Sequence, residues 1–278
     1  MNTLSLGFSP CPNDTFIFYG LVHNLIDSPD LVFKEPLLED VEQLNTKAMA
    51  GELDVTKLSF HALGHVLDEY CLLNAGSALG RGCGPLLIGR EPLEHKKLAG
   101  RTIGIPGKMT TAALLLRMFS PESDHLVEMR FDQIPEAVVR GELDCGLIIH
   151  ESRFTYQQMG LVCIQDLGQW WEDYTGFPIP LGCIAAKRSL GADRIAAIDQ
   201  AIRASCEYSF SHKEECLPYI RKYSQELSVE VVQSHIGLYV NDFSIDLGAE
   251  GIAAVEAFLE LGQKSGALPS SGQSLLVK

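Results

Sequence analysis

The sequence lacks a long apolar run. No stretch approaches the roughly 20 apolar residues that a membrane-spanning helix needs, although hydrophobic residues make up 46% of the 278 positions. The first residues also lack the basic segment followed by an apolar one that is typical of a secretion signal. We therefore expect a globular protein that buries a full core, stays in the cytoplasm and has no membrane partner.

Basic residues are few. The chain has 22 lysines and arginines against 36 aspartates and glutamates, which gives a net charge of −14. A surface of this sign repels phosphate backbones and anionic membranes. We therefore expect no nucleic-acid partner.

Closely spaced cysteines are also missing. The eight cysteines lie at least ten residues apart and form no CxxC pair, so the sequence predicts no zinc framework and no metal site. His61 and His65 have the i, i+4 spacing of helical zinc ligands, but no glutamate follows His61, and a packing or capping role is the expected one. Most cysteines stand in apolar runs, which is typical of small buried thiols in a reducing compartment.

Motifs for nucleotides and for nucleophilic serine are absent as well. The chain contains no GxxxxGK[ST] loop, and the glycines of Gly80–Pro85 lack the spacing of a dinucleotide-binding loop. No serine lies in a GxSxG sequence. The sequence therefore predicts no nucleotide site.

What the chain does contain is a repeated tetrapeptide. The sequence GELD stands at Gly51–Asp54 and again at Gly141–Asp144, ninety residues later. Each copy follows a helical pattern and precedes a mostly apolar strand pattern. These helices are expected at 41–49 and 134–139, and these strands at 55–60 and 145–149. The glycine of each copy fits the end of a helix.

The repetition extends upstream of the tetrapeptide. In each unit a strand, expected at 4–8 and at 102–105, runs into a loop and then a helix. Strand, helix, strand, helix and strand in this order form an α/β unit. Two such units predict two lobes with parallel sheets, and a ligand cleft at the carboxyl ends of the strands and between the lobes.

Two apolar stretches, near 85–90 and 181–187, bracket the second unit and are expected to carry the chain between the lobes as hinge strands. The larger, discontinuous lobe is then expected to comprise residues 1–90 and 187–278, and the smaller lobe residues 91–186.

The segment from about 192 to 262 alternates apolar and charged residues. This pattern predicts amphipathic helices that return to cover the larger lobe, with Pro218 and Gly248 between them.

His150 follows the apolar strand expected at 145–149 and should therefore lie at its carboxyl end, facing the cleft. An ordinary pKa of about 6.5 makes neutral imidazole available as a base near neutral pH. On the residues alone, a structural role is the commoner one for a single histidine at a strand end. The neighbouring Glu151, Ser152 and Arg153 favour a functional role, because one could orient the ring and another could bind an anion.

The matching strand end of the first unit carries Lys57, Leu58 and Ser59. Because side chains alternate along a strand, Lys57 and Ser59 point the same way. They could present a cation and a hydroxyl to a polar ligand, or they could be a solvated lysine and a buried serine. The residues leave both interpretations open.

Thr110 and Thr111 precede a run of alanine and leucine, so one of them is expected to cap a helix. The unpaired N–H groups of such a helix start bind carboxylates and phosphates. Ala112 leaves room for a ligand to approach, although a plain cap without a ligand is the commoner case.

Several stretches together resemble the 1,4-dihydroxy-6-naphthoate synthase family of the futalosine route to menaquinone. The most specific are Gly7–Phe16, Thr56–Ser59 and Gly146–Tyr156. Further matching stretches are Leu38–Asn45, Ala78–Pro85 and Pro178–Gly182. The resemblance therefore runs over nearly the whole chain.

This resemblance implies a type 2 periplasmic-binding-protein-like fold, in which two α/β lobes enclose a ligand cleft. It implies a carbon-carbon lyase without a cofactor, which converts cyclic dehypoxanthinylfutalosine, a small-molecule carboxylate, to 1,4-dihydroxy-6-naphthoate in menaquinone (vitamin K2) biosynthesis. The family's catalytic base falls on His150. Its substrate contacts fall on Lys57, Leu58, Ser59, Thr111 and Ala112, with Asn45 as an addition.

Two other functions are compatible with the same fold. One is chorismate dehydratase of the same pathway, against which the strand motif leading to His150 favours the synthase. The other is a non-catalytic protein that binds a small anion as a solute receptor. Such receptors normally carry a secretion signal or a lipid-attachment cysteine. The sequence leaves the oligomeric state, the lobe arrangement and the group that orients His150 open, as it does the order of bond cleavage and aromatisation.

Overall fold

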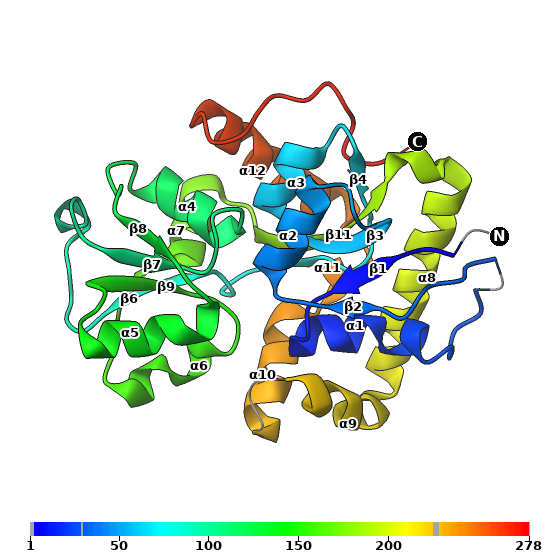
Figure 1. Ribbon diagram of the computed structural model, residues 1–278, viewed down its shortest axis with the longest axis horizontal. Coiled ribbons are helices and arrows are strands. Elements are labelled where there is room, and N and C mark those ends of the chain that lie inside the picture. The colour runs from blue at the N-terminus through cyan, green and yellow to red at the C-terminus, as the bar shows by residue number, and fades with distance from the viewer. Residues whose placement is uncertain (1–2, 29, 225–227, 278) are drawn as a thin grey trace.

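The computed structural model describes residues 3–28, 30–224 and 228–277, which form two α/β lobes lying side by side (Figure 1). The larger lobe contains a six-stranded sheet in the order β2-β1-β3-β11-β4, with β5 also paired to β11. Its strands are β1 (Leu6–Phe8), β2 (Leu37–Leu38), β3 (Val55–Ser59), β4 (Tyr70–Leu72), β5 (Ala78–Gly80) and β11 (Ile179–Lys187). The smaller lobe contains a five-stranded sheet in the order β10-β6-β9-β7-β8. Its strands are β6 (Leu86–Gly89), β7 (Ile103–Ile105), β8 (Leu126–Glu128), β9 (Cys145–Ile148) and β10 (Val162–Asp166).

The expected duplication is present in both sheets. In the larger lobe β1 pairs in parallel with β2 and β3, and in the smaller lobe β7 pairs in parallel with β8 and β9. The connecting helices are α1 (Pro12–Val22) and α2 (Val41–Met49) in the first unit, and α4 (Thr111–Phe119) and α5 (Ile134–Arg140) in the second. The repeated tetrapeptide therefore marks one structural unit that occurs twice.

The aspartate of the tetrapeptide makes the same bond in each lobe. Asp54 Oδ2 accepts a hydrogen bond from the backbone N–H of Ser5 at 2.8 Å, and Asp144 Oδ2 accepts one from the N–H of Thr102 at 2.9 Å. Each aspartate thus joins the start of the unit's third strand to the start of its first strand. A carboxylate that accepts a buried backbone N–H satisfies a group that would otherwise be left without a partner.

The leucine of each tetrapeptide packs against a glycine of the first strand. A Cβ atom on Gly7 would lie 2.6 Å from the Leu53 side chain, and one on Gly104 would lie 2.5 Å from that of Leu143. The leading glycines of the two copies have φ angles of 64° and 76°, the left-handed conformation expected at a helix end. Packing and backbone conformation together explain why these residue types recur.

The sheets are mixed, and the expectation of purely parallel sheets was wrong. β11 runs antiparallel to β3, and β6 runs antiparallel to β9. These two strands follow crossovers from the other lobe and do not follow a helix of their own unit. Their direction is therefore set by the side from which the chain arrives.

The two strands expected as hinges are members of the sheets. β6 belongs to the sheet of the smaller lobe and β11 to that of the larger lobe, so the chain crosses between the sheets at 81–85 and at 176–178. On this sheet membership we propose that the smaller lobe comprises residues 81–178, in place of the expected 91–186.

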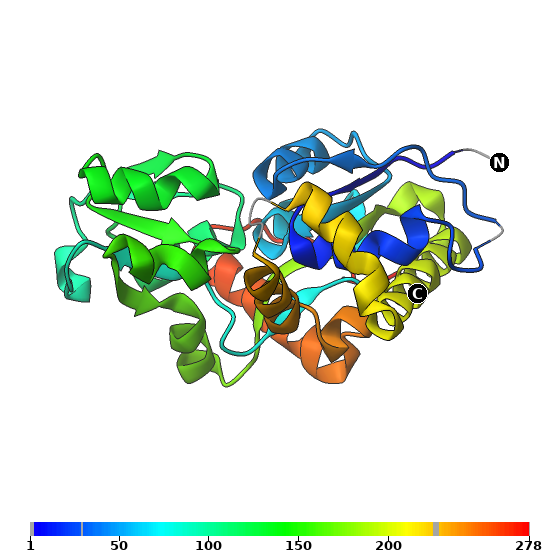
Figure 2. The same ribbon diagram turned by 90° about the horizontal axis from the view of Figure 1, so that it is seen from below.

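The helices after β11 cover the larger lobe, as the amphipathic pattern predicts (Figures 1 and 2). They are α8 (Ala192–Ser211), α9 (Lys213–Tyr223), α10 (Val229–Tyr239), α11 (Asp242–Ile245) and α12 (Gly248–Lys264). The Ser205 hydroxyl of α8 donates to the Ile17 carbonyl of α1 at 2.7 Å. Pro218 lies inside α9, not between helices, whereas Gly248 begins α12. In the described part of the chain, no helix is both long and apolar enough to cross a bilayer.

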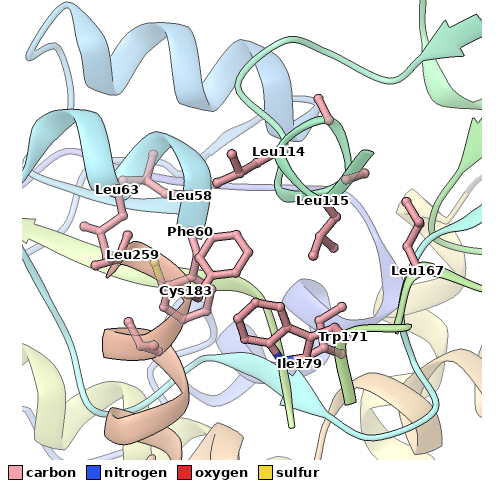
Figure 3. Close-up of a cluster of buried hydrophobic side chains, with 14 of the residues drawn as sticks. Leu58, Phe60, Leu63, Leu114, Leu115, Leu167, Trp171, Ile179, Cys183 and Leu259 are labelled. Carbon is pink, nitrogen blue, oxygen red and sulfur yellow. The ribbon is translucent and has the colours of Figure 1, made fainter. Parts of the chain in front are cut away.

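An apolar core joins the lobes beside the crossovers (Figure 3). Phe60, which begins α3 (Phe60–Val66), and Leu259 of α12 lie in one cluster with Leu114 of α4 and Trp171 of α7 (Leu167–Thr175). The Trp171 ring lies 5.5 Å from that of Phe258, and its indole N–H donates to a backbone carbonyl at 3.1 Å. We therefore expect any separation of the lobes to pivot at this end.

Candidate active site

A cavity of about 80 Å³ lies between the two lobes. Lys57 and Ser59 of β3 border it from the larger lobe, and Thr111 and Ala112 of α4 border it from the smaller lobe together with His150. Five of the seven residues that the sequence points to thus border one space.

The other two residues lie outside this lining. Leu58 is fully buried in the apolar core (Figure 3). Strand alternation places it on the opposite side of β3 from Lys57 and Ser59. Asn45 of α2 stands behind Ser59. Its amide donates to Ser59 Oγ at 3.2 Å, and its oxygen accepts the Ser59 N–H at 2.9 Å. Asn45 therefore holds Ser59 in place, and Leu58 can offer a ligand only its backbone.

His150 lies just past the end of its strand. β9 ends at Ile148, and His150 has a φ of 56°, a left-handed conformation that is uncommon outside glycine. Two other rings lie near the His150 ring: the centroid of the edge-on Phe131 ring is 4.9 Å away, and that of the near-parallel His235 ring is 6.0 Å away. The smaller lobe supplies Phe131, and α10 of the larger lobe supplies His235, so the imidazole is held between the lobes.

A buried chain of polar contacts runs from the cavity to His235. Lys57 Nζ lies 2.6 Å from Asp14 Oδ1, and the two side chains are 6% and 0% exposed. The Asn13 amide donates to the same Asp14 oxygen at 2.7 Å, and the Asn13 oxygen lies 2.9 Å from His235 Nε2. An oxygen acceptor at this position assigns the proton to Nε2 of His235.

Burial keeps this second histidine neutral. It lowers the pKa of His235 well below its usual range, and the nearby His150 and Lys57 lower it further. The near-parallel ring beside His150 is therefore uncharged, and it places no positive charge next to the His150 imidazole.

The start of α4 faces the same cavity. The Thr110 hydroxyl caps the helix by accepting the Ala113 N–H at 3.2 Å, as the sequence predicts for one of the two threonines. The N–H groups of Thr111 and Ala112 belong to the first turn, which offers them no acceptor within the helix. The Thr111 hydroxyl donates to the Leu181 carbonyl of β11 at 2.6 Å, which fixes this helix start against the larger lobe.

Two further bonds connect the lobes around the cavity. Glu42 of α2 accepts the Met109 N–H at 2.8 Å, and burial raises the pKa of its carboxyl group. His61 of α3 lies 3.1 Å through Nδ1 from the Thr110 carbonyl, and burial lowers its pKa to about 4. Two ionisable side chains of the larger lobe, Glu42 and His61, therefore contact backbone groups of the smaller lobe.

A second and larger cavity of about 460 Å³ opens beside the first. Among the residues that the structure describes, five carboxylate residues border it together with a single guanidinium residue, Arg130, which is paired with Asp132. The carboxylates are Glu39, Asp40, Glu42, Glu128 and Glu151. Two of them are paired with lysines, Glu39 with Lys47 at 3.9 Å and Glu128 with Lys108 at 3.8 Å. The lining is therefore rich in carboxylates.

One group of side chains has the composition of a metal site. The ligand atoms of Cys11, His150 and Glu151 lie within 4.8 Å of one another, and Cys11 and Glu151 are buried. Sequence spacing could not reveal this group, because Cys11 comes from the larger lobe and the other two residues come from the smaller lobe. His235 was missed for the same reason, since a histidine on an amphipathic helix carries no signal of what it faces.

The architecture defines the class of protein. The chain superposes on the alkanesulfonate-binding protein of Xanthomonas axonopodis pv. citri, solved with MOPS, with a TM-score of 0.71 at 13% identity, covering 96% of this chain and 94% of that one. The periplasmic aliphatic sulphonate-binding protein of Escherichia coli gives 0.67 at 13% identity, covering 97% and 89%. At such low identity the likeness establishes the fold alone. The chain has the two-lobed periplasmic-binding-protein-like fold, as expected.

Closer likenesses identify the family within that class. The family model described as menaquinone biosynthesis matches residues 4–264. The chain is 50% identical to the 1,4-dihydroxy-6-naphthoate synthase of Thermus thermophilus, covering 100% of both chains, and 42% identical to that of Streptomyces coelicolor, covering 99% and 98%. A solved protein of Archaeoglobus fulgidus is 34% identical with a TM-score of 0.90, covering 96% and 98%. The chain belongs to the menaquinone biosynthesis family.

Proposed function

We propose that the chain is a 1,4-dihydroxy-6-naphthoate synthase, which converts cyclic dehypoxanthinylfutalosine to 1,4-dihydroxy-6-naphthoate with His150 as the general base. The observation that carries the proposal is the likeness to two synthases at 50% and 42% identity over their whole lengths. The cavity that unites His150 with a cation, a hydroxyl and a helix start supports it.

In this proposal, the neutral His150 imidazole removes an acidic C–H proton next to a carbonyl of the substrate. The bond to the sugar-derived fragment then breaks, and the bicyclic product becomes aromatic, which supplies the driving force. The base must stand within about 3 Å of the proton that it removes. The neighbouring rings of Phe131 and His235 restrict the orientation of the imidazole and thereby favour that geometry.

The substrate carboxylate is assigned to the start of α4. The first-turn N–H groups of Thr111 and Ala112 point along the helix axis, where the helix dipole favours a negative charge. Ser59 faces the same cavity, and its hydroxyl oxygen accepts from Asn45, so its own proton is left for the ligand. Lys57, held by Asp14, adds positive charge where an enolate would develop.

Catalysis in this site requires the lobes to move. The cavity holds about 80 Å³, which is small against the roughly 300–1,000 Å³ of typical ligand pockets. We therefore expect the lobes to separate to admit substrate, pivoting at the apolar core around Trp171. Closure would exclude water and restore the contacts of His150 with the larger lobe.

Product analysis tests this function. The purified protein is incubated separately with cyclic dehypoxanthinylfutalosine and with chorismate, and the products are analysed by mass spectrometry. Formation of 1,4-dihydroxy-6-naphthoate from the first compound alone is the expected result. Dehydration of chorismate would assign the protein to the dehydratase reaction, and binding without any product would assign it to the solute receptors.

Two variants test the role of His150. We expect His150→Ala to lower turnover at least about 10²-fold, the lower end for a positioned base, with the fold intact. His150→Asn is the sharper variant, because asparagine tolerates the left-handed backbone found here. His125→Asn is the matched control, since its side chain is 62% exposed on the smaller lobe. Near-normal turnover by both His150 variants would refute the assignment.

A further inference from the structure

We propose that Cys11, His150 and Glu151 form a binding site for a zinc ion that bridges the two lobes and stops turnover. The three residues supply a sulfur, a nitrogen and an oxygen atom, which is a ligand set that zinc accepts. The binding rests on the geometry of these residues alone. The inhibition also rests on the proposed role of His150 as the base.

The geometry of the three side chains is close to that of a metal site. Their ligand atoms lie within 4.8 Å of one another. Ligand atoms that share one tetrahedral zinc stand about 3.2–3.7 Å apart, given metal–ligand distances of about 2.0–2.3 Å. Each atom therefore has to move by about 1 Å or less, which side-chain rotation supplies. Cys11 is the residue before α1, and His150 and Glu151 follow β9, so the ion would connect the lobes.

The surroundings favour a cation over an anion. The Glu151 carboxylate lies within 4.8 Å of the Cys11 sulfur, and both side chains are buried. Cys11 and Glu151 both border the large cavity with its five carboxylate residues, and this cavity provides a path from solvent. A divalent cation between the thiolate and the carboxylate offsets their mutual repulsion.

The site differs from the substrate anchor in charge and in position. The proposed anchor uses N–H groups and an ammonium group that border the small cavity, whereas Cys11 and Glu151 border the large, carboxylate-rich cavity. When zinc binds, the thiol of Cys11 gives its proton to water and the sulfur binds as thiolate. A ring nitrogen of His150 gives its lone pair to the metal and can then no longer take a proton from substrate. Three protein ligands leave a fourth position for water.

Cobalt is the probe for the binding step, because Co²⁺ occupies zinc sites and absorbs light. The full-length protein is treated with a chelator and titrated with Co²⁺. We expect a thiolate-to-cobalt charge-transfer band that saturates at one equivalent and disappears on addition of zinc. Cys11→Ser should lack the band, and Glu151→Gln should bind cobalt at least about tenfold more weakly, the lower end even for a lost outer partner of a metal site.

Cys163→Ser provides the matched control. Cys163 is the exposed cysteine among those described, and it is therefore the thiol most open to adventitious metal binding. The band should be unchanged in this variant. Absence of the band in the wild type, or its persistence in Cys11→Ser, would overturn the proposal. Cys11→Ala and Glu151→Gln give the same test if the serine variant fails to fold.

Turnover measurements test the consequence of binding. One equivalent of Zn²⁺ should lower the turnover of the wild type and of Cys163→Ser at least about 10²-fold, the amount that a positioned base contributes. A chelator should restore turnover, and Cys11→Ser should keep its own zinc-free rate in the presence of zinc. Full turnover by the metal-loaded wild type would overturn the proposed inhibition, because a metal bound to His150 and a working base on His150 exclude each other, whereas the cobalt band alone decides on the site. If the zinc-free wild type has no synthase activity, the proposed function fails, and the cobalt band still decides on the site.

Discussion

Replacing Asp14 with asparagine is expected to destabilise the protein by about 3–5 kcal/mol, because it leaves the ammonium group of Lys57 buried without its counter-ion. The two charged atoms lie 2.6 Å apart, and the side chains are 0% and 6% exposed. An exposed ion pair is worth only about 0–1 kcal/mol. Because both partners are buried, water cannot take the place of the lost carboxylate, and the larger value of about 3–5 kcal/mol applies to Asp14→Asn.

The opposite change should be milder. Lys57→Met leaves the Asp14 carboxylate buried, but its oxygens still accept hydrogen bonds from the Ser9 N–H, the Ser9 hydroxyl and the Asn13 amide. The double variant removes both charges, so we expect it to be less destabilised than the sum of the single variants. This difference measures the coupling between the two groups.

Urea unfolding at neutral pH, followed by circular dichroism, measures these free energies. Asp132→Asn is the matched control, because it removes the carboxylate of an ion pair with Arg130 whose side chains are 55% and 29% exposed. It should cost less than about 1 kcal/mol. A loss below about 1 kcal/mol for Asp14→Asn as well would refute the reasoning, and it would mean that water reaches Lys57 in solution.

Two further predictions concern the contacts between the lobes. The pKa of His61 is about 4 in the folded protein and about 6.5 when unfolded, so between these values only the unfolded chain binds the proton. His61 is therefore expected to lower stability as the pH falls from about 6.5 to 4, by about 1.4 kcal/mol per pH unit, and His61→Gln should remove that share from urea unfolding curves measured across this window. An unchanged slope would contradict burial of the ring. Thr111→Pro should weaken substrate binding about tenfold or more in calorimetry, because it removes an N–H that would bond a charged group. Thr110 has a φ of −74° and a ψ of 147°, which suits a residue before proline, so the helix should survive. Thr111→Val keeps the N–H and removes only the hydroxyl bond to Leu181, and equal binding by the two variants would argue against the carboxylate anchor.

The duplication could be predicted from sequence because its signals are local. Gly51–Asp54 and Gly141–Asp144 carry a helix end, a packing leucine and a strand-joining aspartate within four residues each. The capping of α4 by Thr110 follows from equally local rules. The two antiparallel strands could not be predicted in this way, because their direction depends on which lobe the chain comes from.

In the candidate site too, the features set by local sequence could be predicted, whereas those that depend on assembly of the two lobes could not. Lys57 and Ser59 could be placed on one face because strand geometry fixes alternation. The partners that act from the other lobe could not be found, since His235 against His150 and Cys11 against Glu151 meet only when the lobes are assembled. The pairing of Asp14 with Lys57 could not be predicted either, because the two residues lie 43 positions apart and meet only when α1 and β3 are assembled in the larger lobe.

The position of β11 has a consequence for the order in which the chain can fold as it leaves the ribosome. β11 lies between β3 and β4 and also holds β5, yet it is made after the whole smaller lobe. When the first 80 residues have been made, the strands of the larger lobe still lack β11. The edges of β3, β4 and β5 that pair with it therefore stay unpaired until the smaller lobe has been synthesised. The smaller lobe is continuous in sequence and can close its own sheet as soon as β10 appears. We therefore expect the smaller lobe to complete its fold before the larger lobe, although synthesis of the larger lobe begins first.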